Sequence, residues 1–189
     1  SAGGSRSPPR FVHDHTPGRV GTANCGYLPR GMRVAMGRNG IFSGWTRAGS
    51  QRVYVRVTTA MKERAASSNG DGLGYEGPPI VLVHGIGASS RSLKPIIHTL
   101  GEEHAVYAPD LPGFGLSDFP THPLDVPGLA EALRRWMLDN QIVSAAVVAV
   151  SSGCQVAVDL AARYPELVER LVLYGPTIDP AGRGPLRLA

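Results

Sequence analysis

Residues 145–166 read AAVVAVSSGCQVAVDLAARYPE, and they say more about the architecture than any other part of the chain. The apolar run 145–150 is short and continuous, which is typical of a parallel strand buried on both faces. Two serines end the run, and apolar residues then recur at helical spacing, at Val156, Leu160 and Tyr164. The pattern predicts a strand, a sharp turn and a buried helix.

One of the two serines fits the apex of this turn better than the other. A turn that projects a side chain from the end of a strand strains the backbone there, so the residues two positions away on each side must be small. With Ser151 at the apex, these residues are Ala149 and Gly153. With Ser152 at the apex, one of them would be the bulky Val150. We therefore predict that Ser151 is the nucleophile.

The same turn predicts donors for a developing oxyanion. The helix begins just after Ser151, so the Ser152 backbone N–H and the positive end of the helix dipole lie where negative charge would form. A second donor is expected from residues 78–90, PPIVLVHGIGASS. There a buried strand, 80–83, runs into a glycine-containing loop that should leave the Ile86 backbone N–H free to donate.

Four motifs together resemble the α/β-hydrolase family, in particular its small bacterial members with a serine nucleophile. They are HGIG after the third strand, YAPDLPGFGLSD (107–118) after the fourth, AVSSGCQVA at the nucleophile elbow, and RLVLYGPTIDP (170–180) on the sixth. The resemblance runs from about Trp45 to Asp179. It implies a mostly parallel sheet with helices on both faces.

The resemblance also implies a site and a reaction. By position, Ser151 is the nucleophile, and the N–H groups of Ile86 and Ser152 form the oxyanion hole. The expected substrate is a small ester, thioester, amide or C–C acyl compound, which is cleaved through a serine acyl-enzyme without a cofactor or metal. Family members with an aspartate at the elbow, such as haloalkane dehalogenases and epoxide hydrolases, are not expected here.

The base of the catalytic triad is missing from these residues. In this fold the triad follows the chain order serine, acid, histidine, whereas the last histidine of the chain is His122. We therefore expect an N-terminal portion of a hydrolase domain, truncated after about the sixth strand and inactive alone. Asp179 is a candidate acid, and the alternative is an Asp-Pro turn that ends the strand. A complementing C-terminal fragment is a candidate partner.

Charge divides the chain into two parts. Residues 1–70 hold 11 Lys and Arg against 2 Asp and Glu, and residues 71–189 hold 8 against 13. Residues 1–42 are rich in Arg, Gly, Ser and Pro, which predicts a disordered basic arm, and the hydrolase portion is expected at 43–189. A nucleic-acid tail and a targeting peptide are alternatives for the arm, but its arginines lack interleaved aromatics, so we predict no nucleic-acid partner.

Few other features of the sequence suggest a further function. The sequence contains no run of 18 or more apolar residues, so no membrane span is predicted. We expect a cytoplasmic protein that does not bind membranes. Residues 126–140 are expected to form an amphipathic helix with Asp125 as N-cap. His84 is expected to shape its loop and Asp110 to fix a turn. A non-catalytic ligand- or partner-binding module of the same fold, with a vestigial Ser151, is the alternative to an enzyme.

Overall fold

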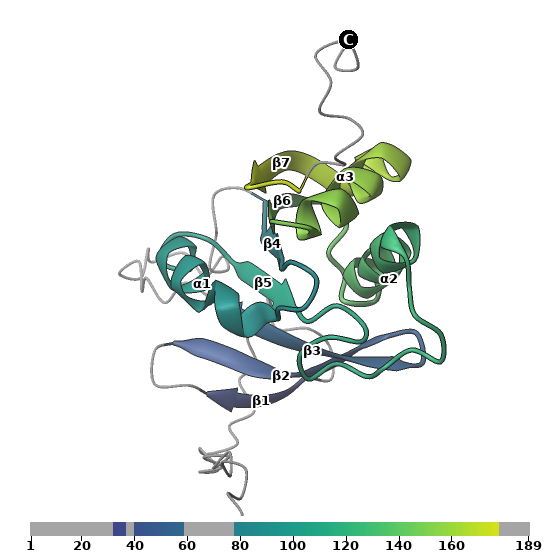
Figure 1. Ribbon diagram of the computed structural model, residues 1–189. Coiled ribbons are helices and arrows are strands. Elements are labelled where there is room, and N and C mark those ends of the chain that lie inside the picture. Colours follow the sequence, from purple (N-terminus) through teal and green to yellow (C-terminus); the bar gives the residue numbers. More distant parts are fainter. Residues whose placement is uncertain (1–31, 37–39, 59–77, 178–189) are drawn as a thin grey trace, which may run out of the picture.

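The computed structural model describes residues 32–36, 40–58 and 78–177, and these residues form one seven-stranded sheet (Figure 1). The strand order is β1-β2-β3-β5-β4-β6-β7. The strands are β1 (Arg33–Met36), β2 (Ile41–Ala48), β3 (Gln51–Thr58), β4 (Ile80–Val83), β5 (Val106–Pro109), β6 (Ala145–Val150) and β7 (Val168–Tyr174). The antiparallel pairs are β1–β2, β2–β3 and β3–β5, so only β1 and β3 run against the other strands.

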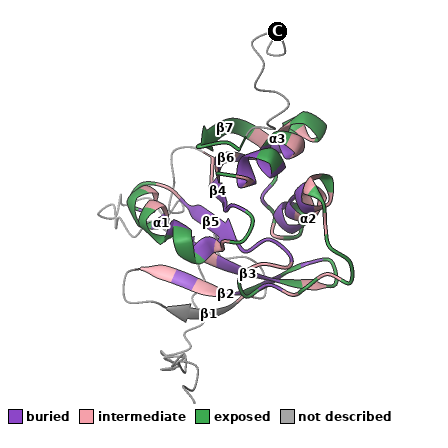
Figure 2. Ribbon diagram, in the orientation of Figure 1, coloured by how far each residue is buried: buried purple, intermediate pink, exposed green. Residues whose placement is uncertain are grey.

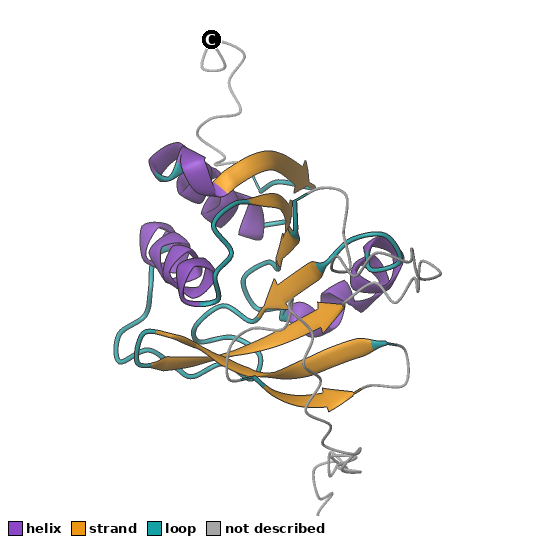
Figure 3. Cartoon of the chain, turned by 180° about the vertical axis from the view of Figure 1, so that it is seen from behind, coloured by secondary structure: helices purple, strands orange, loops and turns teal. Residues whose placement is uncertain are grey.

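Helices cover both faces of the sheet, as predicted (Figures 1 and 3). They are α1 (Lys94–Leu100), α2 (Val126–Asp139) and α3 (Gly153–Arg163). On one face α2 and α3 pack together over a large apolar core. On the other face, α1 and the 3₁₀ turn before it (Ser90–Leu93) cover a smaller one. The fold class expected from the sequence is confirmed.

Local sequence explains the elements that carry the site. All four residues of β4 are buried, as expected of a central parallel strand (Figure 2). The N-cap of α2 is the predicted one, because the Asp125 side chain accepts a hydrogen bond from the Gly128 backbone N–H at 2.8 Å. The apolar stripe of α2, which includes Leu133 and Trp136, is buried against the sheet.

Strand β3 departs from the half-exposed strand that its alternation favours. Valines alternate with Tyr54 and Arg56 in this strand, which favours a half-exposed strand with Tyr54 on its exposed side. Tyr54 is instead buried. The Trp45 ring lies edge-on to the Tyr54 ring, with 5.1 Å between their centroids. The Tyr54 backbone N–H also donates to the Ser117 hydroxyl at 2.9 Å. The loop after β5 therefore covers this side of β3, and the hydropathy of β3 alone does not reveal that cover.

Sheet pairing begins before residue 43, the predicted end of the basic arm. Strand β1 pairs antiparallel with β2 and places Arg33 opposite Trp45. The prediction of a disordered arm over residues 1–42 is therefore corrected at its C-terminal end, since a four-residue strand is too short to show a period. Residues 1–31 lie outside the described part. With β1 included, the strand expected as the sixth is the seventh, β7.

Strand β7 lies at the edge of the sheet and is largely exposed (Figure 2). It pairs in parallel with β6 on one side, and on its other side it has no strand partner among the described residues. Its exposed large apolar side chains are Leu171, Val172, Leu173 and Tyr174. An exposed apolar edge strand of this kind is prone to pair with another chain segment or another copy of the chain.

Candidate active site

Ser151 occupies the turn between β6 and α3 and has a left-handed backbone, with φ 56°. The side chain is exposed. A non-glycine residue in this region of φ/ψ space is strained and persists only where the surroundings hold it. One stabilising contact is the hydrogen bond from the Ser151 backbone N–H to the Tyr174 carbonyl of β7, at 2.9 Å. Ser152, by contrast, has the helical φ of −63° and is the N-cap of α3.

The small residues that flank Ser151 lie where α3 packs closely against the end of β4. A Cβ added to Gly153 would lie 2.4 Å from the His84 carbonyl oxygen and 2.9 Å from the Val83 carbonyl oxygen. On the other flank, the Ala149 side chain is fully buried. Position 153 therefore has no room for a side chain.

The loop after β4 lies directly against the turn. A Cβ added to Gly85 would lie 3.3 Å from both the Ser151 Cβ and the Ser152 Oγ. The next residue, Ile86, follows in an exposed turn. The structure therefore brings together three of the residues predicted for the site, Ser151, Ser152 and Ile86.

The Ile86 backbone N–H differs from the expectation in one respect. It was predicted to be free, but it donates to the Ser152 hydroxyl oxygen at 2.7 Å. Because the serine was selected for its backbone N–H, the sequence argument took no account of its side chain. The hydroxyl thus lies between the loop after β4 and the start of α3.

His84 shapes the loop and cannot act as a base for Ser151. Its Nε2 accepts a hydrogen bond from the Leu111 backbone N–H at 2.9 Å, so that nitrogen carries no proton. Its Nδ1 then donates to the Gly85 carbonyl, 2.8 Å away. The ring is fully buried, and this burial lowers the pKa of His84 below its ordinary value. Both nitrogens of a neutral ring are therefore already in use.

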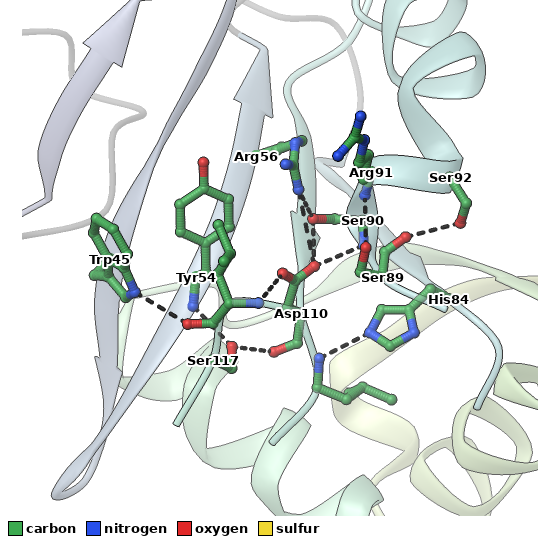
Figure 4. A network of polar contacts seen from close by, with 12 residues as sticks. Trp45, Tyr54, Arg56, His84, Ser89, Ser90, Arg91, Ser92, Asp110 and Ser117 are labelled. Carbon is green, nitrogen blue, oxygen red and sulfur yellow. Dashed lines mark hydrogen bonds and ion pairs between the residues drawn. The ribbon is translucent and has the colours of Figure 1, made fainter. Parts of the chain in front are cut away.

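Asp110 organises the loops beside the site (Figure 4). Its buried carboxylate accepts hydrogen bonds from the Ser90 backbone N–H, at 2.6 Å, and from the Ser90 hydroxyl. Its other oxygen accepts from the Leu116 backbone N–H at 2.9 Å. The Arg56 guanidinium lies 4.0 Å from the carboxylate and also donates to the Ser90 hydroxyl. The predicted turn-fixing role of Asp110 therefore extends to a link between β3, the loop after β5 and the 3₁₀ turn.

An open groove of about 530 Å³ lies next to the loop that carries Ile86. It is lined by Gly87, Ala88, Ser89, Arg91, Ser92 and Gly115. Neither Ser151 nor Ser152 is among these lining residues.

The triad acid and base are not found in the described part of the chain. The candidate acid Asp179 lies outside the described residues. The histidines that are described include His98, His104 and His122, and none of them forms a hydrogen bond with Ser151. Within the same ranges, no three His, Cys, Asp or Glu side chains cluster as metal ligands would. No described helix has the length and hydropathy to cross a membrane.

The chain belongs to the alpha/beta hydrolase fold family, whose profile matches residues 78–185. It is similar to a poly(3-hydroxyalkanoate) depolymerase from Ectopseudomonas oleovorans, with 39% identity over 50% of this chain and 34% of that protein. It also resembles a haloalkane dehalogenase from Mycobacterium marinum, with 33% identity over 58% of this chain and 37% of that protein.

Solved structures support the same family. The 2-hydroxy-6-oxo-6-phenylhexa-2,4-dienoate hydrolase from a Rhodococcus strain superposes with a TM-score of 0.60 at 26% identity. That match covers 76% of this chain and 47% of the hydrolase. The chain spans about a third of the length of each of the two curated relatives named above. Relatives with several chemistries share this fold, so the reaction has to be argued from the site.

Proposed function

We propose that this protein is a serine hydrolase that cleaves a small acyl substrate through a covalent acyl-enzyme. The observation that carries the proposal is the strained, exposed Ser151 at the turn between β6 and α3, with φ 56°. A hydroxyl in this position projects from the C-terminal end of β6, where it can reach an acyl carbon. A serine also distinguishes this turn from the aspartate elbow expected in dehalogenases.

In the proposed reaction, the Ser151 Oγ attacks the acyl carbon and its proton passes to a general base. The carbonyl oxygen becomes an oxyanion, which is stabilised by donors at the start of α3 and in the loop after β4. Collapse releases the alcohol, thiol, amine or carbon leaving group, and water then hydrolyses the Ser151 ester. No step in this scheme requires a cofactor.

We expect the base to come from outside the described residues, because His84 is engaged through both nitrogens and no other described histidine is hydrogen-bonded to Ser151. Asp179 is a candidate for the acid that would orient such a base. A serine hydroxyl without a base is a poor nucleophile, and loss of the triad in serine proteases leaves only about 10³ to 10⁴-fold acceleration over water. We therefore expect little turnover from a polypeptide of these 189 residues alone. A longer chain or a complementing fragment should supply the base.

Active-site labelling tests the proposal in the protein expressed from its complete gene. A fluorophosphonate should modify Ser151, as located by peptide mass spectrometry, and Ser151→Ala should abolish the labelling. Ser144→Ala is the matched control, because Ser144 lies just before β6 and is remote from the turn after it. Labelling that persists in Ser151→Ala would overturn the assignment of the nucleophile.

The alternative is a binding module that keeps the fold without the chemistry. The missing base within the described residues favours it. It predicts a folded protein that resists the fluorophosphonate yet binds a small ligand in the groove beside Ile86. Equilibrium dialysis against short-chain esters and their acids would reveal such binding without turnover.

A further inference from the structure

The Ser152 side chain lies where the predicted oxyanion hole should be open. Its hydroxyl oxygen is 2.7 Å from the Ile86 backbone nitrogen and accepts the hydrogen bond from that N–H. The side chain is partly buried. A substrate oxygen approaching the Ile86 N–H would therefore meet this hydroxyl first.

A hydroxyl can accept and donate hydrogen bonds at the same time. While it accepts from Ile86, the Ser152 hydroxyl keeps its own hydrogen, which has no acceptor among the described residues. An accepted hydrogen bond polarises the hydroxyl and makes it a stronger donor. A developing oxyanion is the strongest acceptor that this region would meet, since bonds to charged groups exceed neutral ones.

The alternative is that Ser152 merely fills the place of the substrate oxygen. The Ile86 N–H could then act directly, but only after its hydrogen bond to the hydroxyl is broken. The Ser152 side chain would also have to leave the space between the loop and the turn. The Gly85 main chain lies close to this side chain, since a Cβ built on Gly85 would be 3.3 Å from the Ser152 Oγ.

We propose that the Ser152 hydroxyl is a catalytic residue that donates directly to the oxyanion, with the Ile86 N–H bonded behind it. The inference rests on the proposed function and assigns the side chain of Ser152 a role, where the family resemblance assigns only its backbone N–H. The relay needs no rearrangement between the resting and the reacting states.

The test compares Ser152→Ala with the wild type, both expressed from the complete gene, on a p-nitrophenyl ester and its thionoester. Removal of one oxyanion donor costs about 10²–10³ in kcat. The freed Ile86 N–H should compensate in part, so we expect a ten- to hundredfold fall in kcat with KM little changed. Because sulfur is a weak acceptor, the preference for the oxygen ester should shrink in Ser152→Ala. Ser152→Thr, which restores a hydroxyl, should recover part of the loss.

The outcomes separate this inference from the proposed function. If the wild type is neither labelled by a fluorophosphonate nor active on the ester, the proposed function fails and the inference fails with it. If the wild type is active and Ser152→Ala is as fast or faster, only the inference fails, and Ser152 is a placeholder for substrate. Equal losses in the Ala and Thr variants would also overturn it. Thermal melting of each variant separates these effects from misfolding.

Discussion

Replacement of Gly153 by alanine should damage the protein more than any single methyl group normally does. The added Cβ would lie 2.4 Å from the His84 carbonyl oxygen, and 2.9 Å from both the His84 carbonyl carbon and the Val83 carbonyl oxygen. All three atoms are backbone atoms at the end of β4, which is paired on both sides within the sheet. No side chain can rotate to make room, so α3 has to move away from β4.

The magnitude follows from this geometry. Extra carbon in a packed core costs about 1–3 kcal/mol, and contact with fixed backbone favours the upper part of that range. Alanine gains up to about 1 kcal/mol over glycine inside a helix, but Gly153 is the first residue of α3, where the gain is smaller. We expect a net loss of about 2–3 kcal/mol in the free energy of unfolding. For a domain of about 150–250 residues, this lowers Tm by about 4–12 °C.

Gly128→Ala is the matched control, because Gly128 also lies in the first turn of a helix. Its added Cβ would contact side-chain atoms only, the nearest being the Asp125 Oδ1 at 3.1 Å. The control should lose less stability than Gly153→Ala, since its contacts are longer and the nearest atom belongs to the Asp125 side chain that caps the helix, not to the backbone of a paired strand. Differential scanning calorimetry of both variants gives the comparison. A Gly153→Ala protein that melts with the wild type would refute the argument that contact with β4 keeps this position free of side chains.

Three further predictions concern the surroundings of the site. Asp110→Asn should lower the free energy of unfolding by about 2–4 kcal/mol in urea titrations, because an amide cannot accept from all the donors around the carboxylate and loses its charge-assisted bonds. Burial lowers the pKa of His84 in the folded protein, so the unfolded chain binds the proton first. Stability should therefore fall as the pH drops below about 6.5, and His84→Gln should weaken that dependence in titrations between pH 7 and 5. In the 189-residue polypeptide, Val172→Lys should reduce self-association in sedimentation experiments, because this β7 side chain is about half exposed; unchanged association would exclude β7 as the contact.

The sequence predicted those features that depend on short-range rules. The small flanks of Ser151 selected it over Ser152, and in the structure only Ser151 of the two has a positive φ. The N-cap and apolar stripe of α2 were likewise readable, since capping and helical periodicity act within a few residues. Each of these rules links residues that are neighbours in the chain, and therefore needs no knowledge of the tertiary structure.

Features that depend on contacts between distant segments were missed or predicted wrongly. The Ile86 N–H was expected to be free, but it donates to the Ser152 hydroxyl, which comes from a distant part of the chain. The sequence around Ile86 alone does not reveal this partner. Tyr54 was expected on the exposed side of its strand, but Trp45 and the loop after β5 lie against it. Strand β1 has no periodic signal of its own and is defined by its pairing with β2. Hydropathy cannot report a cover or partner that lies elsewhere in the sequence.

The strain at Ser151 links the candidate site to the exposed edge of the sheet. A left-handed non-glycine residue costs about 1–3 kcal/mol and persists only where neighbouring structure over-determines it. Here Gly153 packs closely against the backbone at the end of β4, and the Tyr174 carbonyl of β7 accepts a hydrogen bond from the Ser151 N–H. One of these two stabilising contacts therefore comes from the edge strand, β7. Any chain segment that pairs with the open side of β7 should fix Tyr174, and through it should stabilise the backbone conformation that the proposed nucleophile requires.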